Sequence, residues 1–102
     1  MRFMEDRIRE IQLKVDAERK QLSVLESTLT DPATKEYLLK RAWHHLDDVE
    51  MILQWARKAS NASNEAMLLA GANLFLTLAV KQREGVQEII AKYGPNAVMA
   101  GG

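Results

Sequence analysis

The sequence of 102 residues fits one domain, with 47% apolar and 27% charged residues, which is the composition of an ordinary globular protein. Lys plus Arg and Asp plus Glu number 14 each, so the net charge is zero. A neutral chain lacks the basic footprint that binding to nucleic acid or to an anionic membrane requires. Cysteine is absent, which excludes disulfides, thiolate catalysis and thiolate metal sites.

Helix-breaking residues divide the chain into three segments. Asp31-Pro32 is typical of a helix start, because it places an N-cap before a proline at the first helical position. Gly94-Pro95 is typical of a helix end. The tract 60–64 is rich in Ser and Asn, which are N-cap residues, but it has neither Gly nor Pro. A turn is expected there, and a continuous helix through this tract is the alternative.

These signals predict a single helical domain over residues 1–95, with a flexible tail over 96–102. The three predicted helices lie near residues 3–29, 32–60 and 63–93. More than three quarters of the residues should be helical, with no strand, because the sequence is rich in strong helix formers. Helices of this matched length are about 40 Å long, and an antiparallel up-down-up bundle with coiled-coil-like packing is their natural arrangement.

Apolar residues recur in the first two segments at alternating steps of three and four. Glu18 takes one apolar position of the first seam. The first seam comprises Met4, Ile8, Ile11, Val15, Leu22, Leu25 and Leu29, and the second comprises Leu39, Ala42, Leu46, Val49, Leu53 and Ala56. This spacing predicts that both helices pack through a heptad seam.

The third segment is apolar on two sides, which indicates burial on two sides. Its main face should hold Leu68, Ala72, Phe75, Ala79, Val86, Ile89, Ile90 and Tyr93, and a second stripe on roughly the opposite side should hold Leu69, Leu76 and Val80. A strip of small residues lies between them, namely Ala66, Ala70, Asn73 and Thr77. This strip either allows close approach of another helix or simply faces solvent.

Three polar residues fall at positions that should face the core: Glu18, His45 and Gln82. If the chain folds about turns near residues 31 and 62, all three reach a similar height. His45 should then be substantially buried and within hydrogen-bond reach, directly or through a water, of Glu18 or Gln82, because an unpaired buried polar group costs about 1–3 kcal/mol. Such a layer either sets the register of the helices or binds a small ligand.

The surplus apolar residues near the second turn predict self-association. Met51 and Trp55 lie off the seam of the second helix, and Leu69, Leu76 and Val80 lie off the main face of the third. Together these five side chains would form one exposed apolar patch, which a two-fold dimer would cover.

No motif for catalysis or for a cofactor accompanies this architecture. His44 and Asp48 lie one turn apart, but two ligands do not make a metal site. No Gly-rich phosphate loop is present. The acidic start, and an apolar run from 66 to 80 shorter than the roughly 20 residues of a membrane span, favour a cytoplasmic location.

The sequence therefore favours a non-enzymatic protein–protein interaction module without metal or cofactor. It would act as a homo-oligomer that binds a larger protein, as adaptors, chaperones, immunity proteins and inhibitors do. The alternative is a ligand-binding or enzymatic bundle built on the layer of Glu18, His45 and Gln82. A thermal-shift screen against metabolites and metals separates the two, because a ligand stabilises only a protein that binds it.

Overall fold

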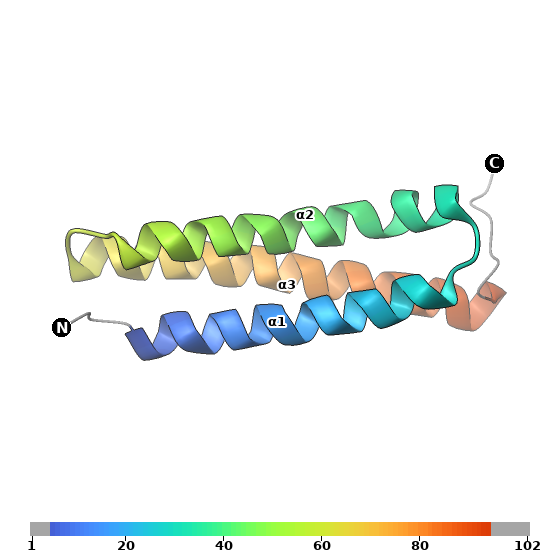
Figure 1. Ribbon diagram of the computed structural model, residues 1–102. Helices are drawn as coiled ribbons and strands as arrows, with labels where there is room; N and C mark the ends of the chain where they lie inside the picture. The colour runs from blue at the N-terminus through green and yellow to red at the C-terminus, as the bar shows by residue number, and fades with distance from the viewer. Residues whose placement is uncertain (1–4, 95–102) are drawn as a thin grey trace.

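The computed structural model describes residues 5–94, of which 91% are helical, and no strand occurs among them. Helix α1 spans Glu5–Thr28, α2 spans Pro32–Arg57 and α3 spans Ala62–Tyr93. Successive helices run in opposite directions and form an elongated bundle (Figure 1). The prediction of an all-helical chain with three long helices is confirmed. Met4, the helix start near residue 3 and the tail 96–102 lie outside the described residues.

The ends of the helices are formed by the capping residues that the sequence indicated. Asp31 caps α2, since its carboxylate accepts hydrogen bonds from the Thr34 N–H (2.8 Å) and the Thr34 hydroxyl (2.7 Å). Asn61 caps α3 by accepting a bond from the Asn64 N–H (2.8 Å). Gly94 ends α3 with a φ of 88°, a left-handed conformation that favours glycine. These caps satisfy backbone groups that a helix end otherwise leaves without a partner.

The second turn separates α2 from α3, so the alternative of one continuous helix is wrong. α2 ends at Arg57, three residues before its predicted end, and α3 begins at Ala62. Two contacts define how the helices align across this turn. The Gln82 side chain donates to the Leu38 carbonyl (3.2 Å), and the rings of His45 and Phe75 lie 5.8 Å apart. The seven-residue step from Leu38 to His45 on α2 therefore lies alongside the seven-residue step from Gln82 back to Phe75 on α3.

The hydrophobic core runs along the centre of the bundle and draws on all three helices. Every described residue of the two predicted seams is buried, and Glu18 is buried with them. The fully buried large side chains are Ile8, Val15, Leu22, Leu29, Leu39, Leu46, Val49, Leu53, Glu65 and Val86. Burial of a Leu or Ile side chain stabilises the fold by about 1.5–3 kcal/mol. The most extensive packing joins α2 to α3, with α1 lying against the pair.

Polar side chains near the surface of the bundle connect α1 to α2. The Arg19 guanidinium bonds to the carboxylates of Asp47 (2.8 Å) and Glu50 (3.0 Å), and the Trp43 indole N–H donates to Glu26 (3.0 Å). Partial burial lowers the pKa of Arg19, but the hydrogen bonds to the two carboxylates outweigh it and raise that pKa above its ordinary value. These contacts fix the alignment of α1 with α2.

Helix α3 buries a different combination of residues from the one predicted. Leu69 and Leu76 are 3% and 7% exposed, so the stripe expected to lie outside the main face is part of the core. Consecutive residues of a helix differ in direction by only about 100°. Leu69 and Leu76 therefore complete a wide stripe with Ala72 and its neighbours, because a helix in a three-helix bundle packs against two others. Tyr93, predicted to be on the main face, is exposed.

The capping carboxylate of Asp31 makes the stability of α2 depend on pH. Hydrogen bonds from the Thr34 hydroxyl and then from its backbone N–H hold the pKa of Asp31 below the ordinary value of 3.8. A carboxyl with a lowered folded-state pKa stabilises the fold above its unfolded pKa, and this stabilisation is lost as the pH falls through the folded pKa. We expect Asp31→Ala to lower the Tm most above about pH 5, with a difference from the wild type that shrinks below about pH 4.

The control is Asp31→Asn, which keeps a capping oxygen but does not titrate. The difference in Tm between Asp31→Asn and Asp31→Ala should not change with pH over this range. Thermal unfolding followed by circular dichroism measures all three proteins. A difference between the wild type and Asp31→Ala that stayed constant down to pH 2 would contradict the capping role of the ionised carboxylate.

Candidate functional site

A buried ion pair connects α1 to α3. The Arg83 Nε donates to the Glu18 carboxylate, and both side chains are almost fully buried. The Arg83 Nη1 also donates to the Gln87 side chain (3.0 Å). An isolated charge in such a place would carry a desolvation penalty of several kcal/mol, so the two residues depend on each other.

The polar layer that the sequence predicted is not assembled. Glu18 bonds to Arg83, whereas Gln82 bonds to the Leu38 carbonyl. Leu38 precedes His45 on α2 by seven residues, about 10 Å along the helix axis, so Gln82 and His45 lie at different heights. His45 packs against Phe75, and its buried Nδ1 has no hydrogen-bond partner. His45 therefore makes no direct hydrogen bond to Glu18 or Gln82, and the prediction of a direct contact is wrong.

Arg83, the partner of Glu18, is not among the core-facing polar residues that the sequence predicts. Arg83 follows Leu76 by seven residues, and Leu76 follows Leu69 by seven. All three lie on one line along α3, and all three are buried. This spacing was visible in the sequence, but it indicates a buried arginine only once the line through Leu69 and Leu76 is taken as part of the core.

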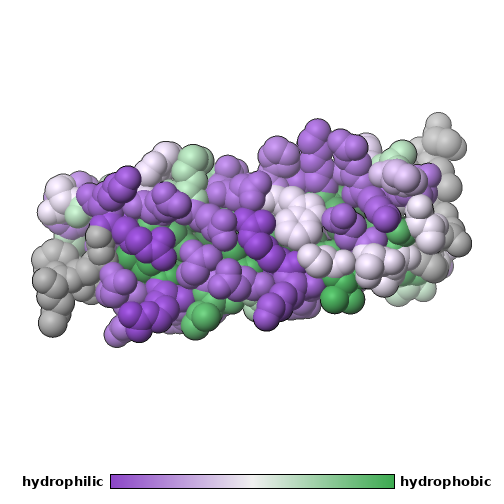
Figure 2. Space-filling view, viewed as in Figure 1, coloured by the Kyte–Doolittle hydropathy of each residue, from purple (hydrophilic) through white to green (hydrophobic). Residues whose placement is uncertain are grey.

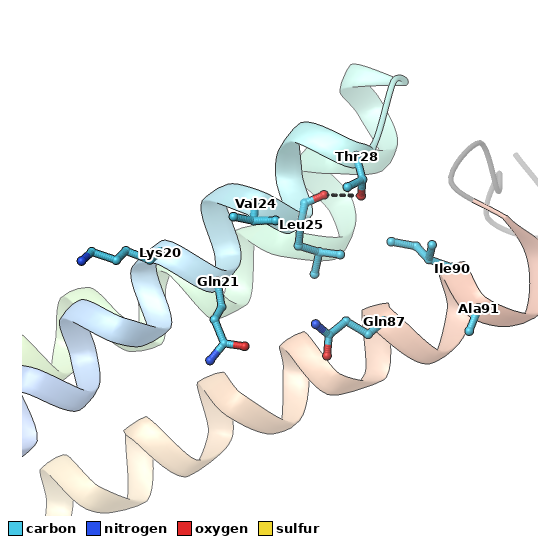
Figure 3. A pocket seen from close by; sticks show the side chains of 8 residues that line it. All are labelled: Lys20, Gln21, Val24, Leu25, Thr28, Gln87, Ile90 and Ala91. Atoms are coloured by element: carbon cyan, nitrogen blue, oxygen red, sulfur yellow. Dashed lines mark hydrogen bonds between the residues drawn. The ribbon is translucent and has the colours of Figure 1, made fainter.

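An apolar groove of about 630 Å³ lies between the C-terminal halves of α1 and α3. Leu25 of α1 and Ile90 of α3 point toward one another across it (Figure 3). The groove is lined by Lys20, Gln21, Val24, Leu25, Thr28, Gln87, Ile90 and Ala91. Its volume is in the range of small-molecule sites, about 300–1,000 Å³. It can accept an apolar group, and the two glutamine amides can bond to polar atoms of such a group.

A second feature is the surface of α3 that points away from the other two helices. We call it the α3 outer face and define it by Met67, Ala70, Gly71, Leu74 and Leu78. Met67, Leu74 and Leu78 are 69%, 59% and 39% exposed. A Cβ atom placed on Gly71 would meet no atom within 4 Å, so open space lies beside this glycine.

The α3 outer face belongs to a stretch without charge. No Lys, Arg, Asp or Glu occurs from 66 to 80, although this stretch contains four turns of helix. Charged side chains normally occupy the solvent side of an amphipathic helix. In contrast, the side of the bundle on which α1 and α2 lie in front of α3 is mostly hydrophilic (Figure 2).

The hydropathy of α3 is high enough to pass a simple test for membrane spans. Among the described residues α3 is the one helix that does so, with a mean hydropathy of 1.3 over 18 residues. The core helix of a soluble protein passes the same test, but only 28% of this window is buried. Leu68, Phe75 and Val80 in this stretch are partly buried against the core, whereas Met67, Leu74 and Leu78 are exposed.

The five side chains predicted to form a self-association patch do not form one surface. Leu69 and Leu76 are in the core, and Val80 is partly buried against it. Met51 and Trp55 of α2 are 46% and 52% exposed. The prediction of a single exposed patch is wrong because it placed the core stripe of α3 on the outside. The exposed apolar residues of α3 lie instead on the α3 outer face.

Histidine and carboxylate side chains are spread along the helices. No group of three or more His, Asp or Glu side chains able to hold a metal occurs within residues 5–94. His44 lies on an exposed face of α2. No protein-family model, curated protein or solved structure matches this chain.

The ion pair of Glu18 and Arg83 makes a specific prediction for stability. Glu18→Leu leaves the Arg83 guanidinium buried without its carboxylate, and Arg83→Met leaves Glu18 without its cation. Each single variant should lose about 3–5 kcal/mol in the free energy of unfolding, whereas the double variant should recover most of that loss. Urea unfolding of the four proteins gives the coupling energy of the pair. A Glu18→Leu variant as stable as the wild type would show that the pair is not formed.

Proposed function

We propose that this chain is a helical protein–protein interaction module that binds through the α3 outer face, self-associates and recruits a larger protein. The observation that supports the proposal best is the exposure of Met67, Leu74 and Leu78 within a helical stretch without charge. Soluble monomers seldom leave contiguous apolar side chains exposed, and such surfaces mark interaction sites.

The spacing of the exposed residues favours a helical partner. Met67, Gly71, Leu74 and Leu78 follow one another at steps of four, three and four. This is the spacing of a heptad seam, which packs against another helix by inserting side chains into holes on the facing helix. The face is therefore suited to a helix or to a groove between two helices on a second protein.

Methionine and glycine give this face a further property of binding surfaces. Met67 has a flexible thioether side chain that adapts to irregular apolar contacts. Gly71 leaves a space that a partner side chain can fill. Full burial of a leucine side chain stabilises a complex by roughly 1.5–3 kcal/mol. Leu74 and Leu78, which are already partly covered, would each contribute a part of this amount to binding.

The alternative, an enzyme or ligand-binding bundle, has less support, because Gln82 and His45 of its proposed layer lie at different heights. The groove between α1 and α3 has no identified occupant. The absence of catalytic activity stays a prediction. Met51 and Trp55 stay candidate contact residues on α2, separate from the α3 outer face.

The proposed function is tested by co-purification from the native cells. A tagged wild-type chain should recover a discrete larger protein, and Leu74→Glu should lose at least nine tenths of it, because a charge in an apolar contact is left desolvated. The matched control is Leu13→Glu, at a similarly exposed leucine of α1, which should recover as much as the wild type.

Circular dichroism and thermal unfolding should show that both variants remain folded, since substitutions of exposed residues usually change stability by less than about 0.5 kcal/mol. Equal recovery by Leu74→Glu and Leu13→Glu would contradict the role of the α3 outer face. Recovery of no protein by the wild type would contradict the recruitment of a larger partner.

A further inference from the structure

We propose that the α3 outer face docks onto the same face of a second copy of this chain, with the two α3 helices antiparallel. The inference rests on the proposed function and names one partner of the same surface. Leu74 of each copy would lie over Gly71 of the other, and Met67 would lie opposite Leu78. The charge along the seam and the space at Gly71 favour this arrangement, and the size of the face limits its strength.

Charge determines the orientation. The seam of Met67, Gly71, Leu74 and Leu78 continues with the same spacing into Lys81, Gly85, Glu88 and Lys92. Parallel packing in register would place Lys81 against its own copy, and likewise Glu88 and Lys92. Like charges in such positions destabilise a contact. Antiparallel packing about the centre of the uncharged stretch brings into contact only the apolar first halves of the two α3 helices.

Gly71 favours the same alignment. Steps of four, three and four read the same in both directions, so an antiparallel copy presents matching positions. The alignment that pairs Met67 with Leu78 also pairs Gly71 with Leu74. The open space beside Gly71 can then take the isobutyl group of Leu74 from the second copy. Two-fold symmetry creates this contact twice, as in most homodimers.

The limited size of the face determines how strong this association is. The α3 outer face from Met67 to Leu78 is about 17 Å long and about one helix diameter wide. Stable interfaces bury about 1,200–2,000 Å² in total, and one helix face of this length falls well below that range. The dimer should therefore dissociate on dilution, which leaves the same surface available to a larger partner.

A membrane fits this face less well than a second copy does. Helices that bind at a membrane surface carry a polar side rich in Lys and Arg, which contacts anionic lipid headgroups. The second half of α3 is polar but carries charges of both signs, with Lys81 and Lys92 accompanied by Glu84 and Glu88. The chain has no net charge.

Cysteine cross-linking tests the geometry, because the chain has no cysteine of its own. An equimolar mixture of Met67→Cys and Leu78→Cys should form a disulfide-linked heterodimer under mild oxidation. Neither variant alone should cross-link efficiently, because in the antiparallel dimer the same residue of two copies lies about 16 Å apart along the axis. Leu13→Cys and Val24→Cys, at exposed positions of α1, are the controls.

Efficient cross-linking of Met67→Cys alone would indicate parallel packing and overturn the proposed orientation. Absence of the mixed disulfide at concentrations from micromolar to millimolar would overturn self-docking. Since the co-purification experiment uses a different readout, a continued dependence on Leu74 there would leave the proposed function standing while this inference fails.

Sedimentation velocity identifies which surface is used. The wild type should shift from monomer to dimer as its concentration rises, and Leu74→Glu should weaken dimerisation at least tenfold. Leu13→Glu, at a similarly exposed leucine of α1, should sediment like the wild type. A loss of the dimer with Trp55→Glu but not with Leu74→Glu would overturn the proposal. Flotation with phosphatidylcholine and phosphatidylglycerol vesicles that depended on Leu74 would assign the face to a membrane instead.

Discussion

The geometry of three packed helices leaves one side of each helix outside the core, and the composition of that side governs the surface of this molecule. α1 and α2 place most of their charged residues there, including the carboxylates that bind Arg19. α3 has no charged residue to place there between 66 and 80. Its two buried sides face α1 and α2, and its third side remains apolar and exposed. The exposed apolar face that we propose as an interaction surface thus follows from a helix that is apolar on more sides than this bundle can cover.

The buried pair of Glu18 and Arg83 acts on the specificity of packing more than on its strength. A buried ion pair is often no more stabilising than apolar residues of the same volume. Sliding α1 along α3 by one turn, however, would separate the two charges and leave both buried. Coiled coils use single polar core residues in the same way to select one register. The pair therefore defines the position of α1 relative to α3, where few other polar contacts occur among the described residues.

The sequence predicted the helices well, because their signals are local. Asp31-Pro32 and Asn61 cap α2 and α3 whatever the bundle does, and the two heptad seams depend only on spacing. The partners of side chains were predicted less well. Gln82 and His45 were assigned to one layer because the second turn was placed slightly too late, and a shift of a few residues along a helix separates side chains by several ångströms. The buried role of Arg83 could not be inferred, because it depends on which neighbour each side of α3 faces.

The unequal packing of the three helices has a consequence for folding. Both turns are short, so pairing of α2 with either neighbour closes a loop at little entropic cost, and the more extensive contact of α2 with α3 favours that pair. Such local hairpins form early in folding, since contacts between residues close in sequence need less ordering of the chain. α1 adds its apolar seam and the carboxylate of Glu18 to that hairpin. It is then the segment whose detachment requires the least free energy, and its amide protons would exchange with solvent before those of α2 and α3.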